Sequence, residues 1–185
     1  MDIAIAQQDV RRVYRHGGVG EVATALVWSA SAVVAMVGSA SVAPYVLFLG
    51  GMLIFPLTTL RLRLLGGPAG LSKGHPMAGL AFQTAMQVPF GMLVALVLAA
   101  VDPRLFFPAV MVIVGAHYLP FVFLYGMRSY LGLGVPMVGG GVLIATLAPG
   151  LSVAGAWGTV ALHLAYAVVS LWRSAAGSAD AGQPQ

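Results

Sequence analysis

The chain contains no cysteine, so disulfides, thiolate zinc sites, iron–sulfur clusters and cysteine nucleophiles are all excluded. Charged residues are scarce as well: they make up 8% of the 185 residues, whereas a soluble domain carries about 25%. Only five side chains are acidic, which leaves little for carboxylate chemistry. Hydrophobic residues, by contrast, form 59% of the sequence. A chain of this composition cannot cover itself with a water-facing surface, and we expect an integral membrane protein.

Four stretches without formal charge set the number of membrane crossings: residues 22–60, 77–101, 105–127 and 129–172. One crossing takes about 20 apolar residues, so the first and last stretches each hold two. Breaks are expected near Pro44 and Pro149, because proline ends or restarts a helix. The sequence therefore predicts an all-α, polytopic bundle of six transmembrane helices. We expect one transmembrane domain over residues 21–173 and a disordered tail over 174–185.

Residues 1–20 form a more polar N-terminal segment. Ile3, Ala6 and Val10 recur at helical spacing beside Arg11 and Arg12. This pattern predicts a short amphipathic helix on the inner membrane surface. The apolar stretch that follows is long and begins at Glu21, which favours an uncleaved first transmembrane helix over a signal peptide.

Basic residues are distributed unevenly along the six predicted crossings. Eight of the nine Lys and Arg side chains fall on one side of the membrane, and only Arg104 falls on the other. The positive-inside rule makes the richer side cytoplasmic. We therefore expect a multi-pass protein of the bacterial inner membrane with both termini in the cytoplasm. The net charge of +4 then follows from topology and anionic lipid, and nucleic-acid binding is not expected.

A local motif lies in the fourth predicted span. Residues 115–121 read Gly-Ala-His-Tyr-Leu-Pro-Phe and are followed by Tyr125 and by Arg-Ser-Tyr at 128–130. The pattern resembles a family of small six-helix bacterial membrane proteins of unknown function, whose members carry Gly-Ala-His-x-Leu-Pro in the fourth helix. Phe121 stands where that family often has Tyr. The resemblance implies topology and localisation, and it implies no activity.

Polar side chains inside the spans are the candidate functional residues, because hydrocarbon penalises them. Glu21 and Asp102 are expected at the edges of spans, which argues against a pump built on an intramembrane carboxylate. A rise of about 1.5 Å per residue puts several polar residues near the midplane. This candidate midplane cluster comprises Gln83, Gln87, His117, His163 and Tyr166, and Arg128 marks a candidate cytoplasmic exit.

Helical spacing groups the polar residues into stripes that are expected to face the bundle interior. One stripe contains Glu21, Thr24, Trp28 and Ser31, and another contains Thr159, His163, Tyr166 and Ser170. Gln83 and Gln87 share one helix face, and His117 shares another with Arg128. We expect His117 at the centre, within direct or one-water reach of Gln83, Gln87 or His163.

Several functions remain open from the sequence. The favoured interpretation is that the cluster is mainly structural and bonds across helices. An alternative is a transporter or channel for a small molecule or ion, lined by Gln83, Gln87, His117 and His163. A second alternative is haem b held by His117 and His163. No metal site is expected, and an enzyme is disfavoured because known catalytic motifs are missing. Small-residue faces on the first and fifth predicted spans are compatible with a homo-oligomer.

Overall fold

The computed structural model describes residues 2–68 and 70–180. In these ranges the α-helices are α1 (Ile3–Val13), α2 (Gly18–Val37), α3 (Ala43–Leu64), α4 (Ala78–Val101), α5 (Phe106–Tyr125), α6 (Leu131–Leu147) and α7 (Ser152–Asp180). Short 3-10 turns are η1 (Arg15–Gly17), η2 (Pro103–Leu105), η3 (Arg128–Tyr130) and η4 (Pro149–Leu151). Within the described residues, six helical segments are long and apolar enough to cross a membrane. The predicted all-α bundle with a short N-terminal helix is confirmed.

The helix boundaries follow the proline and glycine signals. The first long apolar stretch breaks between Val37 and Ala43, and the last breaks at Ala148 before Pro149. Pro56 lies inside α3, and α4, α5 and α6 each contain an internal proline as well. At the other end, α7 continues to Asp180. The disordered tail predicted from residue 174 is therefore wrong as far as Asp180, where alanines favour helix. Residues 181–185 lie outside the described residues.

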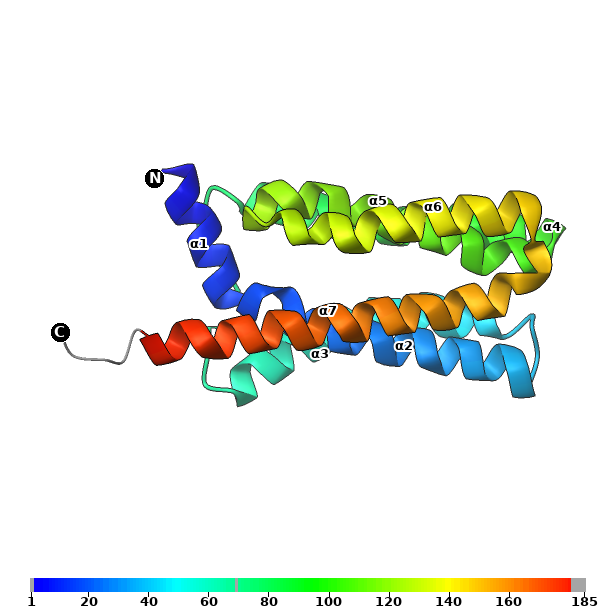
Figure 1. Ribbon diagram of the computed structural model, residues 1–185, viewed down its shortest axis with the longest axis horizontal. Coiled ribbons are helices and arrows are strands. Elements are labelled where there is room, and N and C mark those ends of the chain that lie inside the picture. The colour runs from blue at the N-terminus through cyan, green and yellow to red at the C-terminus, as the bar shows by residue number, and fades with distance from the viewer. Residues whose placement is uncertain (1, 69, 181–185) are drawn as a thin grey trace.

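The helices form two layers (Figure 1). One layer contains α4, α5 and α6, and the other contains α2, α3 and α7. Within the layers the closest pairs are α5 with α6 and α2 with α7. The layers are joined because α7 also contacts α5 and α6. The beginning of α1 and the end of α7 lie at the same end of the bundle in Figure 1.

Glycines set the distance between α5 and α6. A Cβ atom on Gly115 would lie 2.9 Å from the carbonyl oxygen of Gly134, and a Cβ atom on Gly134 would lie 2.8 Å from that of Gly115. A Cβ atom on Gly141 would lie 2.6 Å from the Pro108 carbonyl oxygen. The two backbones thus pack against each other directly, as small residues allow in membranes. The glycine-rich α6 is therefore closely packed and unbroken.

A tight turn at η1 redirects the chain between α1 and α2. Arg15, His16 and Gly17 have φ values of 47°, 56° and 84°, a left-handed run that is strained for the two residues with side chains. The Tyr130 hydroxyl donates to the His16 carbonyl oxygen at 3.2 Å and holds the turn. As a result α2 begins directly against α7, with Gly18 beside the Leu171 side chain.

Helix α1 is held over the C-terminal end of α5. Gln7 Nε2 donates to the carbonyl oxygen of Phe123 at 2.5 Å, and the Arg11 guanidinium donates to that of Tyr125. The Phe123 carbonyl also accepts from the Gly126 backbone N–H at 3.2 Å, so Gln7 is its second donor. A cation at this end of α5 also complements the helix dipole. The α1 side chains of Ala6 and Val10 are buried, so the apolar side of this amphipathic helix packs against the bundle.

Candidate functional site

The most distinctive site in the bundle is built around the carboxylate of Glu21. Its Oε2 atom lies 2.6 Å from Nδ1 of His163 and accepts a hydrogen bond of 3.0 Å from the Tyr118 hydroxyl. The three side chains come from α2, α7 and α5, so the site joins the two layers. We call Glu21, His163 and Tyr118 the carboxylate triad.

All three members of the triad are buried. Their exposed fractions are 4% for Glu21, 0% for His163 and 4% for Tyr118. Glu21 lies in the first turn of α2, as the sequence predicts for a residue at the edge of a span, but its carboxylate is enclosed by other helices, which the sequence did not predict. The physical reason is the η1 turn: it starts α2 alongside the middle part of α7 and brings Glu21 level with His163. An acidic residue that opens an apolar stretch is enclosed because other segments cover it.

Two further polar atoms beside the triad lack partners among the described residues. They are Nε2 of His163 and Oγ1 of Thr159, both fully buried. Residues four apart lie on one helix face, so the two atoms belong to the same face of α7. A buried polar group without a partner costs about 1–3 kcal/mol. The site therefore offers unused hydrogen-bonding capacity next to the carboxylate.

Aromatic hydroxyl side chains continue from the triad toward the end of the bundle that holds α1. The Tyr118 ring stacks on Tyr130 with centroids 5.9 Å apart, and Tyr130 contacts the rings of Tyr125 and Tyr166 at 5.0 and 4.9 Å. Tyr14 packs on Tyr125 at 6.4 Å. The tyrosine cluster (Tyr14, Tyr118, Tyr125, Tyr130 and Tyr166) thus extends from Glu21 to the α1–α2 junction.

Two of the residues predicted for the midplane cluster lie at this site. His163 belongs to the triad, and the hydroxyl of Tyr166 lies 3.1 Å from that of Ser129 within the tyrosine cluster. The two long polar stripes are also oriented as predicted. Glu21, Thr24, Trp28 and Ser31 are buried on α2, and Thr159, His163 and Ser170 are buried on α7. The α2 and α7 faces that carry these stripes therefore belong to the interior.

His117 lies beside the triad but outside its hydrogen bonds. Its ring packs on Tyr118 and Phe121, with centroids 5.4 and 4.5 Å apart, and it approaches the backbone of Thr84. In the described part of the chain its Nδ1 atom has no hydrogen-bond partner. No hydrogen bond between His117 and the three predicted partners occurs there either. The centre of the polar network is Glu21, which the sequence pattern placed at the edge of a span.

Gln83 and Gln87 are not part of the interior. Both side chains are exposed on α4, and Thr84 between them is the buried residue. The expectation that they turn inward is wrong, because α5 packs on the Thr84 side of the helix. Arg128 is exposed in η3, at the end of the bundle where α5 gives way to α6.

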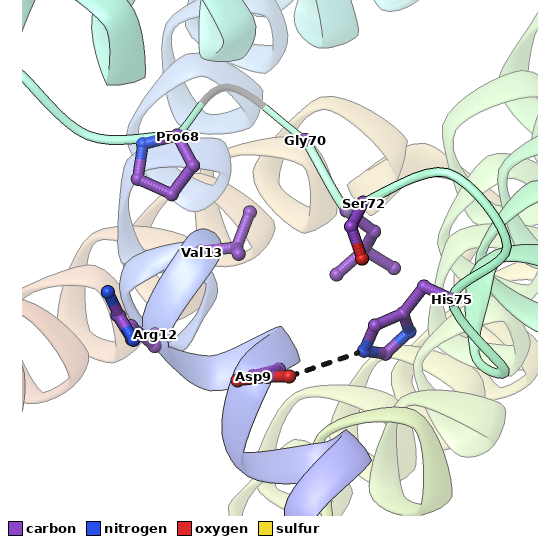
Figure 2. Close-up of a pocket in the computed structure, with 8 residues that line it drawn as sticks. Asp9, Arg12, Val13, Pro68, Gly70, Ser72 and His75 are labelled. Carbon is purple, nitrogen blue, oxygen red and sulfur yellow. Dashed lines mark ion pairs between the residues drawn. The ribbon is translucent and has the colours of Figure 1, made fainter. Parts of the chain in front are cut away.

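A second group of titratable residues lies under α1 and is shown in Figure 2. A cavity of about 350 Å³ is lined by Asp9, Arg12, Val13, Pro68, Gly70, Leu71, Ser72 and His75. His75 Nδ1 accepts from the Met77 backbone at 3.2 Å, and its Nε2 lies 3.8 Å from the Asp9 carboxylate. Nearby, burial raises the pKa of Tyr14, and a hydrogen bond with the Leu71 backbone opposes this shift. These contacts fasten α1 to the α3–α4 connection.

Metal binding finds little support in these groups. In the described part of the chain no three His, Asp or Glu side chains come together as metal ligands would. Haem b between His117 and His163 stays a prediction, for which a Soret band in the purified protein is the direct measurement.

Fold and site together define a multi-pass membrane helix bundle with a buried carboxylate at the junction of its two layers. The chain belongs to a family of unknown function, DUF7010, whose model matches residues 3–174. This match is consistent with the expectation of a family without known function, and it covers the candidate spans as far as residue 174. No curated protein and no solved structure matches the chain.

Proposed function

We propose that this protein is a proton-linked transporter or channel for a small molecule or ion, with Glu21 and His163 as its proton-binding pair. The observation that carries the proposal is the 2.6 Å contact between the Glu21 carboxylate and the His163 imidazole, both buried between apolar helices. Ionisable residues inside a membrane bundle are costly and mark proton or substrate pathways. The sequence offered, as an alternative, a pathway lined by Gln83, Gln87, His117 and His163; the present proposal keeps His163 and centres the pathway on the carboxylate triad.

The geometry of the pair supports movement of a proton. Nδ1 and Oε2 are close enough for a proton to pass between imidazole and carboxylate without rearrangement. The Tyr118 hydroxyl donates a hydrogen bond to the same oxygen. On the other side of the ring, Nε2 of His163 has no hydrogen-bond partner among the described residues, and neither has Oγ1 of Thr159. An imidazole with one engaged and one free nitrogen is suited to relay a proton.

The tyrosine cluster gives this site a connection to one end of the bundle. Its hydroxyl groups can both donate and accept hydrogen bonds, and it reaches the η1 turn below α1. The end with α1 also carries most of the basic residues, which supports its assignment to the cytoplasm. We therefore propose a bacterial inner-membrane protein with cytoplasmic termini, in which α1 and the tyrosine cluster control access to Glu21.

Proton movement into proteoliposomes tests this proposal. Purified protein is reconstituted with a pH-sensitive dye inside the vesicles, and a pH gradient is imposed. We expect the wild type to dissipate the gradient, and Glu21→Gln to lose at least about tenfold of that rate, because the amide cannot carry the proton. Asp102→Asn is the matched control, since this carboxylate is partly exposed, at 27%, and pairs with Arg104 in the α4–α5 connection.

A mainly structural role predicts a different outcome. A wild type that leaves the gradient intact, together with a Glu21→Gln variant that only loses thermal stability, would assign the triad to helix packing. The buried hydrogen bonds among α2, α5 and α7 are the observation that favours this second candidate. The two candidates separate because flux and stability are measured on the same preparations.

A further inference from the structure

One face of α4 combines exposed amides with exposed apolar side chains. The α4 face consists of Gln83, Gln87, Phe90, Val94, Val97 and Val101, which follow one another at intervals of four and three residues. The exposed fraction is 68% for Phe90, 59% for Val94, 67% for Val97 and 80% for Val101, and both glutamines are exposed as well. These residues line one side of the helix over most of its length.

The exposed amides of Gln83 and Gln87 need hydrogen-bond partners inside the membrane. Gln87 is about 15 Å along the helix axis from Met77 at 1.5 Å per residue, near the middle of the bilayer core. Each amide has two donor hydrogens and an acceptor oxygen, and lipid chains satisfy none of them. Thr84 and Thr146 bond to carbonyls of their own helices. No such bond is found for Gln83 or Gln87 in the part of the chain that the structure describes.

We propose that the α4 face is the contact between two copies of this chain. A primary amide is complementary to itself, so a second copy related by a two-fold axis along the membrane normal brings matching donors and acceptors together. The α4 helices then run parallel, with Gln83 and Gln87 near the axis. The four-and-three spacing fits the left-handed crossing of about 20° that is common between membrane helices.

Comparison with the other spans singles out α4. In the apolar stretch of each span, only 17% of the residues are buried for α3 and for α4, against 39–44% for the spans that contain α2, α5 and α7. The middle of α3 carries no amide or charge, so lipid alone is an adequate neighbour for it. The small-residue faces, which the sequence left open to packing within one chain or between two, make contacts within the chain. Gly115 and Gly134 bring α5 to α6, and Ser31 donates to the Ala43 carbonyl oxygen at 2.7 Å.

Cysteine cross-linking of the full chain in native membranes tests this contact, because the natural sequence has no cysteine. We expect Val94→Cys to give a disulfide-linked dimer on mild oxidation. Leu49→Cys, on the equally little buried α3 and equally exposed at 59%, is the matched control and should stay monomeric. Dimers from Leu49→Cys but not from Val94→Cys, or cross-links from Val94→Cys only to other proteins, would overturn the proposal.

The amides themselves are tested in a second experiment that leaves the cross-linking site unchanged. In the Val94→Cys background, Gln83→Leu with Gln87→Leu should lower the dimer yield about tenfold, the effect of losing interhelical amide bonds. Thr146→Val removes an exposed polar group from α6 and should leave the yield unchanged. An undiminished yield in the double variant would show that the amides do not hold the contact. Because the altered side chains are exposed, unchanged thermal unfolding of the monomer is expected and confirms that the variant folds.

Discussion

Glu21 and Gln83 show how the same polar signal leads to opposite positions. Both are polar residues within or beside apolar stretches, yet Glu21 is 4% exposed and Gln83 faces outward. The stripe of Glu21, Thr24, Trp28 and Ser31 could be read from spacing, and it is buried. Spacing defines which residues share a face, but not which neighbouring helix covers that face. The pairing of α2 with α7 decides the outcome for Glu21, and the packing of α5 on Thr84 decides it for Gln83.

At the scale of single residues, the triad predicts a specific order of stability losses. His163→Ala should lower the free energy of unfolding by about 3–5 kcal/mol, because it strands a buried carboxylate. Tyr118→Phe removes one hydrogen bond to that carboxylate and should cost about 1.5–3 kcal/mol. Unfolding by SDS in detergent micelles measures both. Thr146→Val, an exposed control on α6, should stay within about 0.5 kcal/mol, and a His163→Ala variant as stable as this control would contradict the pairing.

Helix α1 illustrates what a single element contributes. An isolated helix of 11 residues is marginal in water, so its position depends on its contacts with α5 and with the α3–α4 connection. The sequence predicted the amphipathic pattern of α1 correctly. It could not show that α1 caps the end of α5, because the acceptors are the backbone carbonyl groups of Phe123 and Tyr125, and every residue type has such a group.

Arg11 and Arg12 provide a matched test of how α1 is held. Arg11→Ala removes the donor to the Tyr125 carbonyl and should speed hydrogen exchange of the α1 amides about tenfold, the effect of one charge-assisted hydrogen bond. Arg12 is exposed, so Arg12→Ala should leave this exchange nearly unchanged although it removes the same charge. Equal exchange rates in both variants would mean that net charge, and not the hydrogen bond, holds α1.

Two glycines on α6 test the close packing of α5 and α6. Gly134→Ala places a methyl group 2.8 Å from the backbone oxygen of Gly115, so the helices must separate, at a cost of about 1–3 kcal/mol. A methyl group added at Gly139 would meet no atom within 4 Å, and Gly139→Ala should stabilise α6 by about 0.5–1 kcal/mol. Unfolding by SDS should give shifts of opposite sign. Two shifts of the same sign would argue against the direct backbone contact.

For the whole molecule, composition and charge carry most of the information about topology. The break before Pro149 and the charge-free stretches gave the order of the spans, because the bilayer imposes the same length on each of them. Residue patterns contain less information about how the spans are arranged into two layers. The contacts of Gly115 with Gly134, and of Glu21 with His163, join residues far apart in sequence. Each depends on the arrangement of several helices at once, so the triad was found only from the structure.

The arrangement of the chain across the membrane yields the last prediction. Ser41, between α2 and α3, and Ser72, between α3 and α4, are both exposed, and six crossings put them on opposite sides. In intact cells, an impermeant maleimide should label Ser41→Cys but not Ser72→Cys, since the proposed orientation puts Ser72, together with the basic residues, on the cytoplasmic side. Permeabilised cells should label both, which shows that each thiol is reactive. Labelling of Ser72→Cys alone in intact cells would invert the orientation, and labelling of both would contradict the number of crossings.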